Sequence, residues 1–398
     1  MMGCSSSQQD VSIQQNKKSS INPYFESSSL GSIKTKNRII MAGMSRLRAD
    51  PKTNIPNDLM AEYYSQRASF GAIITESSAI SSNSNAFPGS GNIYTLEQVE
   101  GWKKVVDKVH QNGGKIIIQL FHCGRVALPS FIGGELPIAP SPIGLTTPHF
   151  FTKQSYPVPK EMNKQDILNV IEQFKNAAIN AKKANFDGIQ LHAGNGYLID
   201  QFLRDGTNKR TDDYGGSIPN RARFLLEVID SISQVFGYDK IGVRLTPTGR
   251  YNEMYDSNPL ELVQYLLKQF EKRNLGFVEL KRHDKTNRKN IQQSAADDGL
   301  VDPELQMPNF FDSIRGLYKG CIILNDGITY EEGLKLLQQN KGDFISFGRY
   351  AVSNPDLPQR FQNNWELSDA DQNTFYRGGD KGYVDYLTYE QSQSKNKS

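Results

Sequence analysis

Eight short runs of β-branched and other apolar residues recur along the chain, and nearly all of them end in polar residues or glycine. They cover residues 38–43, 71–78, 115–122, 188–194, 240–247, 276–282, 320–327 and 343–349. Short, continuous apolar runs are typical of parallel strands that are buried on both faces. The pattern therefore predicts eight such strands.

Amphipathic stretches lie between these runs and predict helices. Residues 167–181 and 225–235 carry apolar side chains at i, i+3, i+4, i+7 spacing, and Gly237 follows the second stretch as a stop signal. Asn57 is a suitable cap for a helix over 58–70, and a proline lies near the start of a further helix around 258–273.

Eight strands that alternate with about eight helices predict an α/β fold, a single (β/α)8 TIM barrel over residues 21–389. A doubly wound sheet is the main alternative, but its glycine-rich phosphate-binding motifs are missing after every predicted strand. Between the third and fourth strands, seven of the 18 prolines lie in a long segment, which predicts a non-helical excursion over the active face. The polar tails 1–20 and 390–398 are expected to be disordered.

The composition narrows the class of protein. Lys and Arg number 46 against 43 Asp and Glu, and a net charge of +3 argues against binding nucleic acid through a basic surface. Three cysteines cannot form a disulfide framework and suggest a reducing compartment. Neither a spanning run of about 18 apolar residues nor a secretory signal is found. We therefore expect a soluble, cytoplasmic protein.

The candidate chemistry comes from the C-terminal ends of the predicted strands, where such barrels place their active sites. The residues there include Gly43, Met44, Ser45, Glu76, Ser77, Gln119, His122, His192, Asn195, Tyr197, Arg244, Lys281, Arg282, Asn325, Asp326, Gly327, Gly348 and Arg349, nearly all of them polar or glycine. These residues include no cluster of His and carboxylate side chains that would predict a metal site. The G-x-S-x-G motif, which places a nucleophilic serine in some hydrolases, is also missing. Gly327, Gly348 and Arg349 follow the last two strands, where barrels often bind phosphate.

At these residues the chain resembles the Old Yellow Enzyme family of FMN-dependent ene reductases, over about residues 22 to 389. The matching segments include MAGMSRLRAD, IQLFHCGR, LHAGNGYLIDQFL, NKRTDDYGGSIPNRARFLLEV and FGRYAVSNPDL. The resemblance implies a ping-pong reaction: NADPH, or NADH in its place, reduces FMN and leaves, and an α,β-unsaturated carbonyl compound then accepts the hydride at its β-carbon.

The resemblance also implies residue roles. His192 and Asn195 would bind the carbonyl oxygen of the substrate, and Tyr197 would protonate its α-carbon. Phe121 and Tyr376 would line the substrate cavity. The residues implied to hold FMN are Gly43, Met44, Ser45, Ser77, Gln119, Arg244, Gly327, Gly348 and Arg349.

Some positions depart from the family's pattern. Gly43-Met44-Ser45 replaces the family's Pro-Leu-Thr, which we expect to loosen that loop while leaving flavin binding intact. Phe121 stands where bacterial relatives often carry Trp, and Arg377 stands where small residues are usual. Asp326 is close in sequence to the residues expected to bind phosphate. Because its carboxylate carries the same charge as a phosphate, its side chain is expected to point away.

Two other functions are kept as alternatives. One is a Schiff-base aldolase that uses Lys281 near the end of the sixth strand. The other is a flavin-binding redox module without turnover. The basic run 281–290 is interpreted as a solvated loop, with contact to the 2′-phosphate of NADPH as the competing interpretation.

The N-terminus carries a further motif. If translation starts at Met2, the sequence M-G-C-S-S-S fits N-myristoylation of Gly3, and Cys4 could add a palmitoyl anchor. Membrane association by acylation is thus an alternative to a purely cytoplasmic location. The physiological substrate and the oligomeric state do not follow from the sequence.

Overall fold

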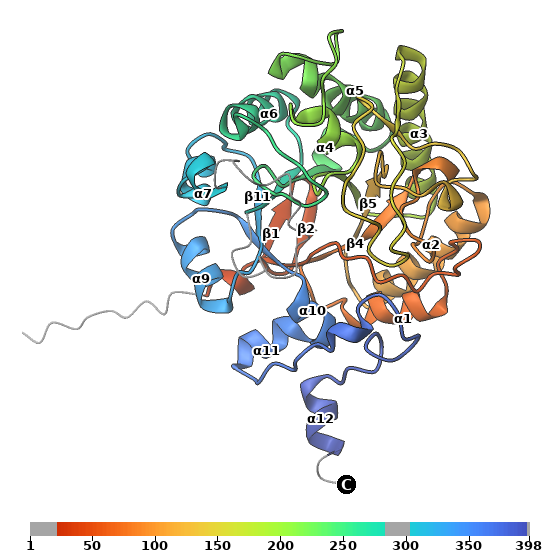
Figure 1. The fold of residues 1–398 in the computed structure, drawn as a ribbon. Coiled ribbons are helices and arrows are strands. Elements are labelled where there is room, and N and C mark those ends of the chain that lie inside the picture. The colour runs from red at the N-terminus through yellow and green to blue at the C-terminus, as the bar shows by residue number, and fades with distance from the viewer. Residues whose placement is uncertain (1–21, 283–302, 396–398) are drawn as a thin grey trace, which may run out of the picture.

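The chain folds around a closed barrel of eight parallel strands, shown in Figure 1. The structure is a computed structural model that describes residues 22–282 and 303–395. The strands follow one another around the barrel in chain order, and the last pairs with the first: β3 Ile39–Met41, β4 Ala72–Ala79, β5 Ile116–Phe121, β8 Gly188–Ala193, β9 Ile241–Leu245, β10 Phe277–Lys281, β11 Ile322–Asn325 and β12 Phe344–Phe347. All eight predicted strands and the predicted TIM barrel are confirmed.

Helices surround the barrel, and their ends follow local sequence signals. The larger ones are α1 Asp58–Gln66, α2 Leu96–Gln111, α3 Lys164–Lys183, α5 Ile218–Phe236, α6 Pro259–Arg273 and α9 Tyr330–Gln338. The Asn57 side chain caps α1 by accepting from the Met60 N–H. This helix ends earlier than predicted, because Arg67 leaves helical backbone geometry and its guanidinium binds the carbonyls of Ala351 and Val352.

A short hairpin fills the N-terminal end of the barrel and was not predicted. It consists of β1 Ser28–Leu30 and β2 Ile33–Thr35, and Figure 1 shows both strands at the centre of the view. Leu30 and Ile33 belong to one apolar cluster with residues of six barrel strands. Gly31 is required at the turn, since its φ is 57° and a Cβ there would lie 1.9 Å from the Asp239 carbonyl oxygen. This end is therefore closed by apolar packing.

The proline-rich segment between β5 and α3 contains the 3-10 turn η3 Pro129–Phe131 and the paired two-residue strands β6 Ile138–Ala139 and β7 Lys160–Glu161. The shorter helices lie outside these long elements. Helix α4 Leu198–Leu203 follows β8, α10 Arg349–Ser353 follows β12, and α11 Leu357–Asn363 follows α10. Helices α7 Pro303–Gln306 and α8 Phe310–Arg315 precede β11. None of the helices in the described ranges is both long and apolar enough to cross a bilayer.

The prediction of a disordered tail from residue 390 is wrong for residues 390–395, which form most of helix α12 Tyr389–Lys395. Thr388 and Gln391 cap its start reciprocally, and the Tyr389 ring stacks on Trp365 at 4.4 Å. The predicted N-terminal tail, the acylation motif at Gly3 and Cys4, and residues 283–290 of the basic run lie outside the described residues.

Candidate active site

A layer of buried polar side chains crosses the barrel interior at the C-terminal ends of the strands. The Gln119 amide donates to Gln190 Oε1 at 2.6 Å, and the Gln190 amide donates to Glu279 Oε2 at 2.9 Å. The strand register places Gln119 beside Gln190 and Arg244 beside Glu279. Ser346 Oγ also donates to Glu279, at 2.7 Å. Glu279 is thus the common acceptor of the layer.

Arg244 is held in this layer by two partners. Its Nη1 lies 2.6 Å from Glu279 Oε1, and its Nη2 donates to Asn325 Oδ1 at 3.0 Å. Arg244 is 6% exposed and Glu279 is fully buried, so water screens this ion pair weakly. A guanidinium fixed in this way suits a flat, polar cofactor whose edge becomes negative on reduction.

Gly43 and Ser77, two of the residues implied to hold FMN, lie next to Gln119. Ser77 Oγ donates to Gln119 Oε1. Gly43 lies against the same amide, because a Cβ at this position would be 2.8 Å from Gln119 Nε2 and from the Thr75 carbonyl oxygen. Met44 and Ser45 follow, both partly buried. The structure therefore brings together Gly43, Ser77 and Gln119, three of the residues implied to hold FMN.

His192 and Asn195 lie side by side at the end of β8. His192 Nε2 and Asn195 Nδ2 are 3.4 Å apart, and His192 Nδ1 is buried without a partner. Asn195 has a φ of 56°, and Thr246 Oγ1 accepts its backbone N–H at 2.9 Å. Burial, with a smaller effect of nearby Arg244, lowers the pKa of His192 to about 3. The imidazole is therefore neutral at physiological pH.

Tyr197 stands at the start of α4, two residues beyond Asn195. Its ring meets His192 and Phe121 edge to face, with centroids 5.1 Å apart in both pairs. Tyr197 is 8% exposed, and burial raises the pKa of its phenol well above the usual value. The phenol thus keeps its proton at neutral pH.

The residues expected to bind phosphate lie where β11 and β12 end. Gly348 and Arg349 begin α10, and a Cβ on Gly348 would lie 3.3 Å from Met44 Sδ. Asp326 Oδ2 lies 3.3 Å from Lys281 Nζ, and Gly327 follows with a φ of 59°. Asp326 therefore pairs with Lys281, the lysine of the aldolase alternative.

The second basic residue of the run 281–290 is also paired. Arg282 forms a bidentate ion pair with Glu332, at 2.6 and 2.9 Å, and donates to the Asp326 carbonyl. The charges of Lys281 and Arg282 are therefore balanced within the chain.

Across the described residues, no group of three or more His, Cys, Asp or Glu side chains could hold a metal ion.

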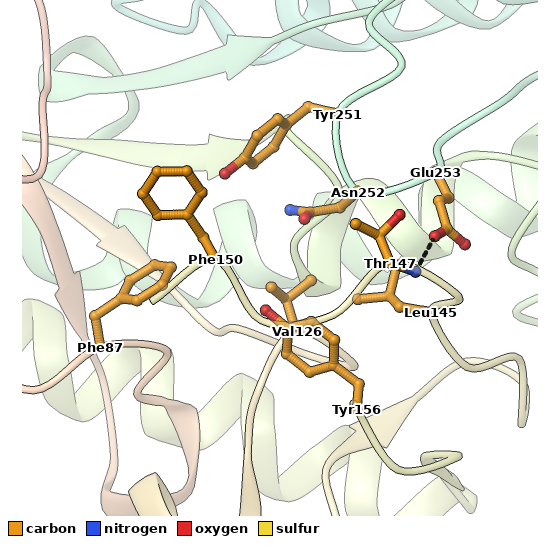
Figure 2. A pocket seen from close by; sticks show the side chains of 9 residues that line it. All are labelled: Phe87, Val126, Leu145, Thr147, Phe150, Tyr156, Tyr251, Asn252 and Glu253. Carbon is orange, nitrogen blue, oxygen red and sulfur yellow. Dashed lines mark hydrogen bonds between the residues drawn. The ribbon is translucent and has the colours of Figure 1, made fainter. Parts of the chain in front are cut away.

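Figure 2 shows a pocket whose lining residues Val126 and Leu145 belong to the same apolar cluster as Tyr197. Its lining is largely apolar or aromatic: Phe87, Val126, Leu145, Thr147, Phe150, Tyr156, Tyr251, Asn252 and Glu253. In Figure 2, Phe87 and Phe150 lie on one side, Leu145 and Thr147 on the other, and the Asn252 amide is directed inward. Tyr376, predicted to line the substrate cavity, is not among these residues; it is 43% exposed, and its ring meets that of Phe150 edge to face with centroids 6.3 Å apart.

Three buried members of the polar layer were not predicted from the sequence. Gln190, Glu279 and Ser346 each interrupt an apolar strand run with one buried polar side chain. Such an interruption at the same level in neighbouring strands is the signal that could have revealed them.

Glu76 is a further buried acid near the site. Its Oε2 accepts the backbone N–H groups of Arg46 and Leu47, while Oε1 is buried without a partner. Burial raises the pKa of Glu76 to about 7, against the opposing effect of these hydrogen bonds. The pKa of Glu76 is higher in the folded than in the unfolded state. Its contribution to the free energy of unfolding is therefore fully present below about pH 4.5 and is lost as pH rises through 7.

We therefore expect Glu76→Gln to remove this pH dependence. Relative to the variant, the unmodified protein should lose about 3 kcal/mol of unfolding free energy between pH 4.5 and 8. Urea unfolding of the FMN-loaded proteins at several pH values measures the difference. A constant difference across this range would show that Glu76 has an ordinary pKa.

Comparison with known proteins gives a consistent result. Residues 23–368 match the NADH:flavin oxidoreductase / NADH oxidase family. A probable flavin mononucleotide-dependent alkene reductase of Leishmania infantum is 36% identical over 365 residues, covering 88% of this chain and 93% of the relative. The rice 12-oxophytodienoate reductase 7 is 35% identical over 381 residues, covering 94% and 96%.

Solved structures agree in fold and in sequence. Morphinone reductase in complex with tetrahydroNAD superposes with a TM-score of 0.83 at 34% identity, covering 93% of this chain and 98% of that one. An Old Yellow Enzyme homologue from Zymomonas mobilis gives a TM-score of 0.84 at 34% identity, covering 92% and 99%. The chain therefore belongs to the NADH:flavin oxidoreductase / NADH oxidase family, the Old Yellow Enzyme family that its motifs resemble.

Proposed function

We propose that this enzyme reduces the activated C=C bond of α,β-unsaturated carbonyl compounds, with His192 and Asn195 binding the carbonyl oxygen and Tyr197 donating the proton. The observation that carries this proposal is the pair of side-chain nitrogens 3.4 Å apart beside a buried phenol. Two nitrogens at this separation can both lie within about 3 Å of one oxygen atom. The relatives named as alkene and 12-oxophytodienoate reductases support the same substrate class.

The paired donors stabilise charge that develops during the reaction. As a hydride reaches the β-carbon, negative charge grows on the carbonyl oxygen, so two fixed donors bind the transition state more tightly than the substrate. Neutral His192 can supply one N–H only, and Asn195 supplies the other. The backbone bonds of Asn195 to Thr246 Oγ1 and to the Asn252 amide hold the second donor in place.

Tyr197 completes the reduction. An enolate carbon is basic enough to take a proton from a phenol whose pKa is raised, and the rings of His192 and Phe121 fix the position of Tyr197. The phenol must regain its proton from solvent before the next turnover.

The residues of the site fit FMN. Gln119 offers a donor and an acceptor, Arg244 a fixed positive charge, and Gly348 with Arg349 a place for the phosphate at the end of β12. The chemistry that bound FMN contributes is hydride transfer from the nicotinamide coenzyme to the substrate. We propose NADPH or NADH as the coenzyme, because Lys281 and Arg282 already pair with Asp326 and Glu332 and do not by themselves favour NADPH.

One experiment tests this function. The purified protein is loaded with FMN, and oxidation of NADPH is followed spectroscopically with and without 2-cyclohexenone. We expect bleaching of the flavin absorbance by NADPH and its recovery on addition of the enone. A protein that binds FMN and is reduced, but is never reoxidised by enones, would be the redox module instead. A protein without affinity for FMN would contradict both.

A further inference from the structure

Arg125 is a buried cation that joins two segments far apart in the sequence. It is 2% exposed and lies in the loop after β5. Its Nη1 donates to the carbonyl oxygens of Ile143 at 3.1 Å and Gly144 at 3.4 Å, in the proline-rich segment. Its Nη2 donates to those of Asn252 at 2.8 Å and Glu253 at 3.3 Å, in the loop of residues 246–258, here called the β9–α6 loop. A buried charge is costly unless hydrogen bonds compensate it, so the four carbonyls are held close to the guanidinium.

The β9–α6 loop makes a strained turn at the point that Arg125 binds. Asn252 and Glu253 are consecutive and have φ values of 55° and 57°. Left-handed backbone is uncommon for residues other than glycine, and it persists only where surrounding contacts hold it. Both carbonyls accept from Arg125. The Glu253 carboxylate also accepts the backbone N–H groups of Thr146 at 3.0 Å and Thr147 at 2.8 Å, and Figure 2 marks the second of these bonds. Two separate sets of bonds therefore hold the turn.

The same turn contacts Asn195, one of the two proposed donors to the substrate. The Asn252 amide donates to the Asn195 carbonyl at 2.8 Å. The two backbones also pack closely, because a Cβ on Gly196 would lie 2.6 Å from Asn252 Cβ and 3.0 Å from the Tyr251 carbonyl oxygen. Asn195 itself has a φ of 56°, so its backbone also depends on contacts from its surroundings. A shift of the turn would thus move the Asn195 donor.

We propose that Arg125 is a positioning residue for the bound carbonyl oxygen, and that it acts through Asn252. The inference rests on the proposed function and adds a residue outside the motif of His192, Asn195 and Tyr197. Arg125 fixes the turn, Asn252 bonds to the backbone of Asn195, and the Asn195 amide is held where negative charge develops. A donor stabilises that charge most when it is already in place, because no reorganisation is then needed during the reaction.

The test isolates the second half-reaction of the FMN-loaded enzyme. The flavin is reduced with dithionite, and its reoxidation by 2-cyclohexenone is followed by stopped-flow absorbance. We expect Arg125→Lys to slow reoxidation about tenfold, since a Lys ammonium has three donors for four carbonyls, and a misplaced donor costs less than the roughly 10²–10³-fold of a removed one. The loss should fall mainly on the limiting rate and not on the enone concentration at half-saturation. FMN affinity, measured by fluorescence titration, should stay unchanged.

Two glycine variants test the link to the turn. Glycine tolerates a positive φ, so these changes remove a side chain without straining the backbone. Asn252→Gly removes the bond to Asn195 and should slow reoxidation by a similar factor. Asn340→Gly is the matched control: Asn340 is an exposed residue just after α9 with a φ of 54°, and its replacement should leave reoxidation unchanged.

A double variant separates positioning from a general loss of stability. Asn195→Gly removes the second donor and tolerates the same φ, so adding Arg125→Lys to it should cause less than about twofold further loss. Additive losses, or a fall in FMN affinity as large as the fall in rate, would overturn the positioning role. If Arg125→Lys does not fold, Glu253→Gly frees the same turn from the proline-rich segment, and no loss in it or in Asn252→Gly would overturn the proposal. An unmodified enzyme that the enone does not reoxidise would contradict the proposed function instead.

Discussion

Replacing Tyr197 with phenylalanine is expected to slow enone reduction by about 10²–10⁴-fold, the usual contribution of a positioned proton donor. Reduction of FMN by NADPH should stay within about twofold of the unmodified enzyme, because that half-reaction requires no proton from Tyr197. The phenyl ring preserves the edge-to-face contacts with His192 and Phe121, so the fold of the site should be maintained. The hydroxyl is the only group removed.

Stopped-flow absorbance measures the two half-reactions separately. The first follows flavin bleaching by NADPH, and the second follows reoxidation of the reduced enzyme by 2-cyclohexenone. Tyr156→Phe is the matched control, since Tyr156 is a partly buried tyrosine that lines the neighbouring pocket. Equal slowing of both half-reactions by Tyr197→Phe would contradict the proton-donor role and would indicate a disturbed flavin site.

The barrel could be predicted because its determinants are local. Each strand is a short apolar run, and each long helix has one apolar face, so both periodicities are visible without knowledge of contacts. The ends of the helices are harder to predict from the sequence, because contacts with distant residues determine where a helix stops. Helix α1 ends at Gln66 where Arg67 turns to bind carbonyls of α10, and the contact joins residues 284 and 285 positions apart.

The proposed catalytic residues follow from a motif, whereas the residues that support the site do not. His192, Asn195 and Tyr197 lie within six residues, so one sequence segment identifies all three. The support of Arg244 by Glu279 and Asn325 depends on barrel closure, which brings β9, β10 and β11 together. The carbonyls that Arg125 binds in the β9–α6 loop likewise lie more than 120 positions away.

The replacement of the family's proline by Gly43 has a structural context. Gly43 packs tightly against the Gln119 side chain and the Thr75 carbonyl, and these contacts restrict the movement of its backbone. Its neighbour Arg46 donates to the carbonyls of Phe375 and Gly382, which anchors the loop a few residues further on. The expected loosening of this loop is therefore opposed by contacts that the sequence did not reveal.

Replacing Glu279 with leucine is expected to lower the free energy of unfolding by about 3–5 kcal/mol, the cost typical of breaking a buried ion pair. Arg244 would lose the carboxylate that lies 2.6 Å from its Nη1. The Gln190 amide and the Ser346 hydroxyl would also lose their acceptor. FMN affinity should fall as well, since Arg244 would no longer be held toward the cofactor.

Urea unfolding and fluorescence titration of FMN measure the two effects. Glu279→Gln is the matched control: it keeps an acceptor oxygen for the hydrogen bonds but removes the charge, so its loss of stability should be smaller. The double variant Arg244→Met with Glu279→Leu removes both charges and should be more stable than Glu279→Leu alone, although it should bind FMN weakly. If Glu279→Leu is as stable as the unmodified enzyme, or if the double variant is less stable than Glu279→Leu, the ion pair does not organise the polar layer of the barrel.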